Sequence, residues 1–99
     1  MTEYEVTCID KPHRDSTHEH ISHIGNMKEG WRLTRMSAIA HIDSKADAFY
    51  IVDRSTGKRC YLGVMREQGK AAYLRSYSDG KWNDKLLELE ECGSGCRTC

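Results

Sequence analysis

Basic and aromatic side chains alternate along two neighbouring stretches of the sequence, and this is the pattern that could bind a ligand most directly. Its members are Arg59, Tyr61, Tyr73, Arg75 and Tyr77. Residues two apart in a strand point to the same face, so all five would share one side of a sheet. Aromatic rings with arginines on an open sheet stack and neutralise single-stranded nucleic acid. The alternative, favoured by the zero net charge, is that the tyrosines are cross-strand pairs that shield the sheet.

Histidines form a second cluster, in the first quarter of the chain. On a strand, His18 and His20 would point to one face, at a spacing that could hold a metal ion between two imidazoles. Glu19 would lie on the opposite face, so a third ligand is missing, and a site with two histidines alone is weak. The sequence His-Glu-x-x-His of zinc peptidases is absent, because Ser22 stands where the second histidine is needed. We favour the alternative that one of these histidines fixes the loop by a backbone hydrogen bond.

Three cysteines stand at the end of the chain, Cys92, Cys96 and Cys99. Their spacing matches the cluster-binding triad of radical enzymes that use S-adenosylmethionine, but those enzymes place it inside a large barrel. Three thiolates could instead bind zinc, with Cys8, Cys60 or a histidine as the fourth ligand. The spacing departs from the paired cysteines of zinc ribbons. We therefore expect no metal and no other cofactor, with zinc at the tail as the alternative.

Motifs for catalysis are missing from the chain. There is no Gly-x-Ser-x-Gly, and Gly57-Lys58 lacks the upstream glycine of a phosphate-binding loop. Cys8 and Cys60 lie in predicted strands, where a buried cysteine behaves as a small hydrophobe. We therefore expect no catalytic residues and a protein that is not an enzyme.

Length and composition narrow the class of protein. Ninety-nine residues suffice for one domain, and fifteen acidic residues balance fifteen basic ones. A duplex-binding module usually has a basic footprint, which this balance lacks. No apolar run approaches the ~20 residues of a membrane span. Residues 1–5 lack the apolar core of a signal peptide, so we expect a cytoplasmic protein without a disulfide framework.

One helix should organise the elements that carry these residues. It is predicted over residues 35–44, with Thr34 as its N-cap. The apolar side of the helical wheel consists of Met36, Ile39, Ala40, Ile42 and Ala46. This pattern predicts that Ile39 is almost fully buried against the sheet and that His41 is at least half exposed.

Strands are predicted at residues 3–9, 19–24, 48–52, 59–65 and 71–77. Short turns separate the last three, which is typical of an antiparallel meander. Residues 82–89 fit either one helical turn or an extended segment. Together these elements predict an α+β fold, with one helix packed on a mostly antiparallel sheet of about five strands. The domain would span residues 1–92, with a flexible cysteine-rich tail at 93–99, and one sheet face would remain for a partner.

A family resemblance runs along the same elements. The matching residues are Val6-Thr7-Cys8-Ile9, His18-Glu19-His20-Ile21, Ile24-Gly25, Trp31-Arg32-Leu33, Ala38-Ile39, Phe49-Tyr50-Ile51-Val52, Tyr73-Leu74-Arg75, Asp79-Gly80, Leu86-Leu87-Glu88-Leu89 and Cys92. Over residues 4–92 the chain resembles a small bacterial family known as a domain of unknown function, number 3892. The resemblance implies a shared fold and no site. Two features depart from it: Glu90 stands where the family has a proline, and Cys96 and Cys99 are unaccounted for.

The sequence thus predicts a non-enzymatic binding module that uses an open sheet face. Its partner would be a protein or a single-stranded nucleic acid, with no membrane involved. A small zinc-binding protein, with a site at Cys92, Cys96 and Cys99, is the alternative.

Overall fold

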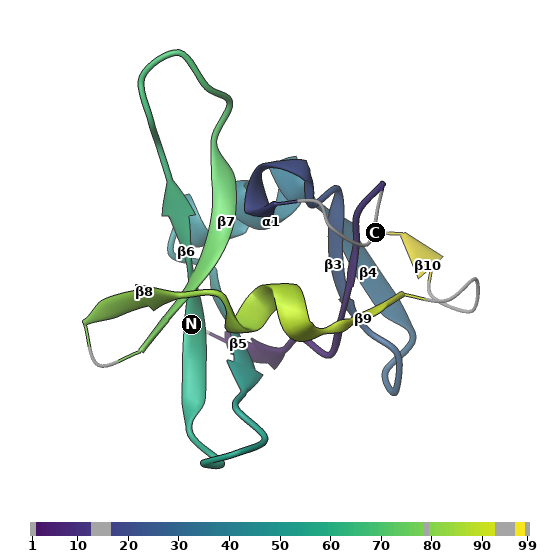
Figure 1. Cartoon of the computed structure of the whole chain (residues 1–99). Helices are drawn as coiled ribbons and strands as arrows, with labels where there is room; N and C mark the ends of the chain where they lie inside the picture. Colours follow the sequence, from purple (N-terminus) through teal and green to yellow (C-terminus); the bar gives the residue numbers. More distant parts are fainter. Residues whose placement is uncertain (1, 13–16, 79, 93–96, 99) are drawn as a thin grey trace.

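Within the residues that the structure describes, the fold consists of ten short strands, one α-helix and two 3-10 turns (Figure 1). This computed structural model describes residues 2–12, 17–78, 80–92 and 97–98. In chain order the elements are β1 (Thr2–Glu5), β2 (Cys8–Asp10), η1 (His18–His20), β3 (His23–Asn26), β4 (Trp31–Thr34), α1 (Arg35–Asp43), β5 (Asp47–Val52), β6 (Arg59–Met65), β7 (Tyr73–Ser78), β8 (Lys81–Asn83), η2 (Lys85–Glu88), β9 (Glu90–Glu91) and β10 (Arg97–Thr98).

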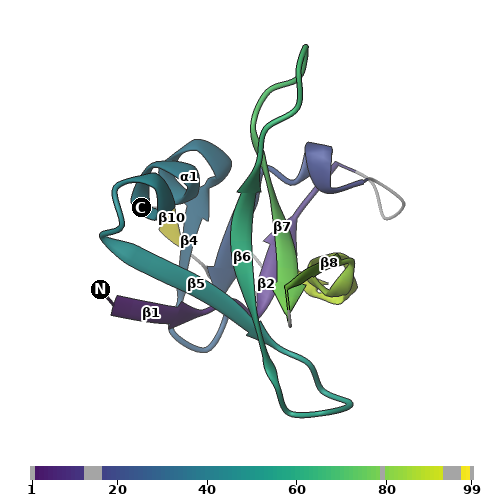
Figure 2. The ribbon, with the colours of Figure 1, turned by 90° about the vertical axis from the view of Figure 1, so that its left-hand side faces the viewer.

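The strands form two sheets rather than the single sheet expected. Sheet A has the order β1-β5-β6-β7-β8, and sheet B has the order β10-β4-β3-β2-β9. Most pairs are antiparallel, but β1–β5, β2–β9 and β4–β10 are parallel. The α+β class with its meander β5-β6-β7 is therefore confirmed, whereas the single-sheet detail is only partly matched. Figure 2 shows β1 alongside β5 and α1 above β4.

The sheets are joined where one strand was expected at residues 3–9. The N–H of Val6 donates to Tyr50 O in sheet A at 2.7 Å. The next N–H, that of Thr7, donates to Gly25 O in sheet B at 2.8 Å. The chain thus leaves one sheet and enters the other within two residues, and the buried Val6 side chain fills the corner. Alternation of side chains along residues 3–9 cannot by itself show that the chain passes from one sheet to the other.

The core lies between the inner faces of the sheets. Its buried members are Val6, Ile9, Ile21, Ile24, Ala38, Phe49, Ile51, Cys60, Leu62, Leu74 and Leu86. In sheet A they come from alternate positions of β5, β6 and β7, as a sheet with one buried face requires. The opposite face of these strands is therefore left outside the core.

Helix α1 lies across the junction of both sheets and contacts β4 and β5. Thr34 caps it as predicted, since its hydroxyl accepts from the Ser37 N–H at 3.2 Å. The predicted orientation is wrong: Ala38 is the fully buried residue, Ile39 is partly buried and Met36 is 79% exposed. A small side chain allows the helix to approach two sheets closely, so the buried side centres on Ala38.

The elements of sheet B differ from several of those predicted for the first third of the chain. The strand expected at 19–24 is instead the turn η1 followed by β3, and the lead into the helix is β4. The ambiguous residues 82–89 contain the end of β8 and the turn η2. Of the tail expected at 93–99, the structure describes Arg97–Thr98, which pair with β4. The remainder, including Cys96 and Cys99, lies outside the described residues.

A disulfide bond joins Cys8 of β2 to Cys92, 84 residues further along the chain. The expectation of a chain without disulfides is therefore wrong. Both cysteines are buried, and the Cys92 N–H donates to the Asp10 carboxylate at 3.1 Å. Cys92 is thus anchored to sheet B, whereas Leu87 and Leu89 pack against the main core.

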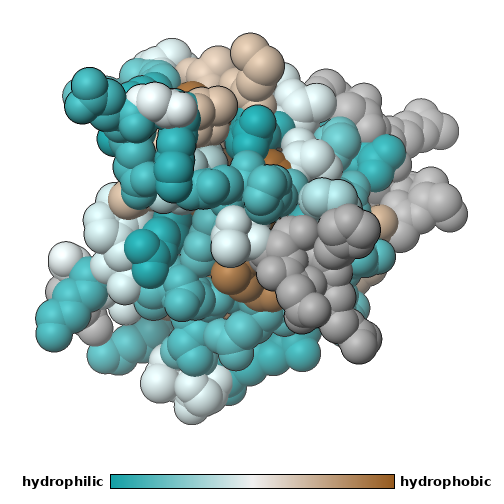
Figure 3. Space-filling model, turned by 45° about the horizontal axis from the view of Figure 1, so that its top comes forward, coloured by the Kyte–Doolittle hydropathy of each residue, from teal (hydrophilic) through white to brown (hydrophobic). Residues whose placement is uncertain are grey.

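The surface seen from the α1 end is mostly hydrophilic, with hydrophobic residues showing only as small patches (Figure 3). Among the described residues, no helix has the length and apolar character needed to cross a membrane.

Candidate functional site: the outer face of sheet A

Four aromatic residues stand opposite one another across four strands of sheet A. Tyr50 pairs with Tyr61, Tyr61 with Tyr77, and Tyr77 with Trp82. Directly opposed residues point to the same face of a sheet, and neighbouring strands lie about 4.8 Å apart, so this row spans roughly 14 Å. We call the row, with Arg59, Gly63 and Arg75 beside it, the outer face. The sequence predicted that Arg59, Tyr61, Tyr73, Arg75 and Tyr77 share one side, and the strand register places them so.

The exposed aromatic part of the outer face is the pair Tyr77 and Trp82, at 39% and 43% exposure. Their rings meet edge to face with centroids 5.4 Å apart. Gly63 makes room for this pair, because a Cβ at that position would lie 2.7 Å from the Trp82 ring. Two large rings are therefore held in fixed positions while both remain accessible.

Charges beside the other end of the row are paired. The Glu3 carboxylate of β1 accepts from the Arg59 guanidinium at 3.1 Å and from the Tyr61 hydroxyl at 2.7 Å. The Arg59 guanidinium also lies over the Tyr50 ring, 4.2 Å from its centroid. A hydrogen bond with Tyr61 is the first cause that raises the pKa of Arg59. Arg59 is therefore charged but already has a carboxylate partner.

Arg75 flanks the aromatic row on its other side and is also paired. Its guanidinium donates to the Asn83 carbonyl at 3.3 Å and to the Asp84 carboxylate at 3.1 Å. The same carboxylate oxygen lies 3.8 Å from Nε2 of His18, a buried atom with no hydrogen-bond partner among the described residues. Burial is the main cause that lowers the pKa of His18, so the imidazole is neutral at neutral pH.

Tyr73, one of the five residues that the sequence pattern placed on one side of the sheet, is not accessible there, because only 6% of its surface is exposed. Its hydroxyl donates to the Glu67 carboxylate at 2.8 Å. That bond raises the pKa of Tyr73 and is the first cause that lowers the pKa of Glu67. Lys70 then bridges Glu67 to Glu19 of η1, so the β6–β7 loop and η1 are tied together around the ring. Tyr73 therefore supports the outer face without being part of it.

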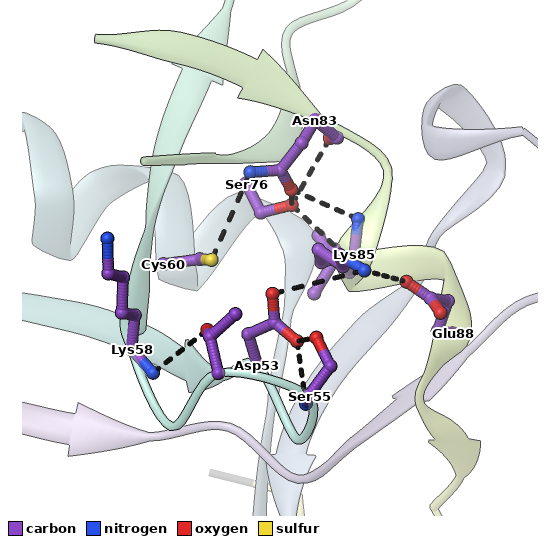
Figure 4. Close-up of polar contacts among 10 residues, drawn as sticks. Asp53, Ser55, Lys58, Cys60, Ser76, Asn83, Lys85 and Glu88 are labelled. Carbon is purple, nitrogen blue, oxygen red and sulfur yellow. Dashed lines mark hydrogen bonds and ion pairs between the residues drawn. The ribbon is translucent and has the colours of Figure 1, made fainter. Parts of the chain in front are cut away.

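A polar network on the inner side of sheet A fixes β8, the strand that carries Trp82 (Figure 4). The fully buried Ser76 hydroxyl lies 2.6 Å from Asn83 Oδ1 and accepts from the Leu86 N–H at 3.1 Å. Asn83 Oδ1 also accepts from the Lys85 N–H at 3.0 Å. Buried polar groups need such partners. The network therefore joins β7, β8 and η2 into one unit.

The neighbouring β5–β6 turn is linked to this unit. Asp53 accepts two hydrogen bonds from Ser55, whose hydroxyl is the first cause that lowers the Asp53 pKa. Lys85 Nζ lies 3.9 Å from Asp53 and 3.5 Å from Glu88 (Figure 4). These contacts stabilise the β5–β6 turn and connect it to η2.

Those candidate metal ligands that the structure describes do not come together. His18 and His20 lie on the turn η1 rather than on a strand, with His18 buried and His20 exposed. The sulfur of Cys92 is bonded to Cys8, so with this bond intact it is not a thiolate ligand. Across residues 2–12, 17–78, 80–92 and 97–98, no group of three or more His, Cys, Asp or Glu residues could hold a metal ion.

Two members of the aromatic row, Tyr50 and Trp82, were missed as candidate site residues. Trp82 lies in the segment 82–89, for which the sequence fits either a helical turn or an extended segment. Tyr50 lies in the strand predicted at residues 48–52, outside the two stretches in which basic and aromatic residues alternate. One signal was available: an isolated glycine within a strand, here Gly63, indicates close approach of another group. The Trp82 ring is that group.

Comparisons with known proteins support a family and no activity. A family model described as "Protein of unknown function (DUF3892)" matches residues 5–90, which confirms the resemblance seen in the sequence. No curated protein and no solved structure matches this chain.

Proposed function

This chain belongs to the DUF3892 family of proteins of unknown function, and we propose that it is a non-enzymatic module that binds a protein partner through the outer face. The observation that carries the proposal is the exposed pair Tyr77 and Trp82, held over Gly63 at the end of a cross-strand aromatic row. Rigid Trp, Tyr and Arg side chains supply most of the binding energy at protein interfaces.

Charge favours a protein over a single-stranded nucleic acid. Each arginine of the outer face has a carboxylate partner, Glu3 for Arg59 and Asp84 for Arg75. A phosphate would have to displace these partners, and the chain has no excess positive charge to attract it. A protein surface can instead cover the aromatic row and leave both ion pairs at the rim.

The test compares capture of a partner by three forms of the protein. Wild type and the double variant Tyr77→Ala/Trp82→Ala are immobilised beside Met36→Ala, a matched control that removes an exposed side chain from α1. We expect a protein retained by wild type and by the control and lost by the double variant, since central aromatic anchors contribute about 2–4 kcal/mol each. Equal retention by all three forms would contradict the proposal.

A second arm tests the nucleic-acid alternative directly. A short single-stranded oligonucleotide is titrated at low salt while the amide signals of β6 and β7 are followed by NMR. We expect no saturable shift. Saturable shifts on the outer face that weaken steeply with salt would replace the protein partner by single-stranded nucleic acid.

A further inference from the structure

A second aromatic surface lies where the edges of the two sheets meet, on the inner side of β1. Here a pocket of about 240 Å³ is lined by Tyr4, Trp31, Leu33, His41, Asp47 and Phe49. We call it the seam pocket. Sheet A contributes Tyr4, Asp47 and Phe49, sheet B contributes Trp31 and Leu33, and α1 contributes His41. None of these six residues belongs to the outer face, whose residue Tyr50 lines only the adjoining hollow described below.

Three rings form a continuous aromatic floor in the seam pocket. The centroids of Tyr4 and Trp31 are 5.9 Å apart, those of Tyr4 and Phe49 are 6.0 Å apart, and those of Trp31 and Phe49 are 6.2 Å apart. Phe49 is buried, whereas Tyr4 is 40% exposed and Trp31 is half-buried. The electron-rich faces of such rings attract cations, most strongly when the cation is partly desolvated.

Four of the described side chains around this floor are carboxylates. Inside the pocket, Asp47 Oδ2 lies 2.7 Å from Nδ1 of His41. An adjoining hollow of about 470 Å³ shares Tyr4 and Trp31 and adds three carboxylates, those of Glu3, Glu5 and Glu29. The Glu3 carboxylate forms an ion pair with Arg59. Neither Glu5 nor Glu29 forms an ion pair with another described residue.

The described residues lining the two hollows include no lysine and no arginine. The charge of this surface therefore has the same sign as that of a phosphate or carboxylate ligand and is complementary to that of a cation. A compact organic ammonium ion would place its alkyl groups on Tyr4 and Trp31, with the Asp47 carboxylate inside the pocket and the Glu29 carboxylate at the rim of the adjoining hollow. We propose that the seam pocket binds an alkylammonium group, carried by a small molecule or by a modified lysine side chain.

Choline and its uncharged isostere 3,3-dimethylbutan-1-ol test this proposal, because they have the same shape and differ in charge. The variant Trp82→Phe leaves Trp31 as the single tryptophan, so its fluorescence reports on the pocket. We expect a saturable change with choline and binding of the isostere that is about tenfold weaker. Equal binding of the two compounds, or no change with choline, would overturn the proposal.

Variants separate the pocket from its surroundings. Tyr4→Leu removes one ring of the floor, and Glu29→Gln removes an exposed rim charge without disturbing the core. Both should weaken choline binding, while Met36→Ala should leave it unchanged. If neither variant weakens binding, choline binds elsewhere and the assignment fails. Because no variant here except the reporter touches the outer face, failure of this proposal leaves the proposed function standing.

The source of the ammonium group is resolved by a further titration. N-acetyl-trimethyllysine amide presents the same cation on a peptide-like stem. Tighter binding of this compound than of choline would identify a modified lysine side chain as the ligand, and tighter binding of choline would identify a free small molecule.

Discussion

Sheet A and sheet B hold their strands together by different means. In sheet A, the strands β5, β6 and β7 have six or seven residues, and every second side chain enters the core. In sheet B no strand exceeds four residues. Strands this short offer few ladder hydrogen bonds and little apolar area, so other contacts must fix their positions.

Those contacts converge on Asp10 and on the disulfide. The Asp10 carboxylate accepts from Arg32 at 2.8 Å and from the Cys92 N–H at 3.1 Å, while its carbonyl accepts from the Ser22 N–H at 2.8 Å. Cys8, two residues before Asp10, is bonded to Cys92. The difference shows that one small core can be closed by periodic packing on one side and by a few point contacts on the other.

Breaking the disulfide should have the largest effect on this contrast. The double variant Cys8→Ala/Cys92→Ala removes a link across 84 residues, and we expect a loss of about 2–5 kcal/mol in the free energy of unfolding. Hydrogen exchange should show amides of β2 and β3 losing protection before those of β6 and β7. As a control, reductant should destabilise wild type but not the double variant. Equal loss of protection in both sheets would contradict the contrast.

Sheet A should respond to loss of its buried polar network. Ser76→Ala leaves the Leu86 N–H without its partner and removes one of the two hydrogen bonds at Asn83 Oδ1, so we expect a cost of about 1–3 kcal/mol in denaturant unfolding. The neighbouring exposed position offers a control, since Tyr77→Ala removes more atoms but no buried hydrogen bond. A larger stability loss for Tyr77→Ala than for Ser76→Ala would show that the network is not what fixes β8.

A substitution at Gly63 should change the position of the Trp82 ring on the outer face while it changes the stability of the protein only slightly. In Gly63→Ala, the new methyl group would lie 2.7 Å from the Trp82 ring, which is partly exposed and able to move. We expect unfolding free energy to change by no more than about 1 kcal/mol, while the Trp82 indole NMR signal shifts clearly. An unchanged indole signal would mean that the ring does not rest on Gly63.

The smallest effect concerns pH and His18, beside β7. Burial lowers its pKa from the ordinary 6.5; Arg75 and Lys11 lower it further, and Asp84 partly opposes them. As pH falls below that value, the unfolded chain binds more protons at His18 than the folded chain does. The free energy of unfolding therefore decreases as pH falls, with a slope that corresponds to at most one proton. In His18→Leu, the free energy of unfolding should therefore depend less on pH between pH 7 and pH 5 than it does in wild type. The exposed His20→Leu is the control, and identical pH profiles for wild type and His18→Leu would contradict this.

How far the sequence predicts this fold follows from the same contrast. Residues 59–65 alternate over seven positions, long enough for a period of two to be recognised, and β6 begins and ends as predicted. Strands such as β9, with two residues, carry no period at all. Pairing of Cys8 with Cys92 joins opposite ends of the described domain, and no local pattern indicates it.

The candidate site was predicted in part for a related reason. Alternation placed Arg59, Tyr61, Arg75 and Tyr77 on one face, because they lie in long strands. It could not show that Glu67 and Lys70 would close around Tyr73, since those contacts come from a loop and from η1. Trp82 follows a turn and lies in a strand of three residues, so its place in the aromatic row depends on tertiary structure.

The most direct test of the proposed function is site-specific photo-cross-linking in cells that make this protein. A benzoylphenylalanine is placed at Trp82, within the exposed aromatic pair, or at Met36 on α1, which is even more accessible. The account predicts one discrete protein adduct from position 82, absent from position 36 and lost when Tyr77→Ala is added. Adducts of the same pattern from both positions, or an adduct to nucleic acid from position 82, would contradict it.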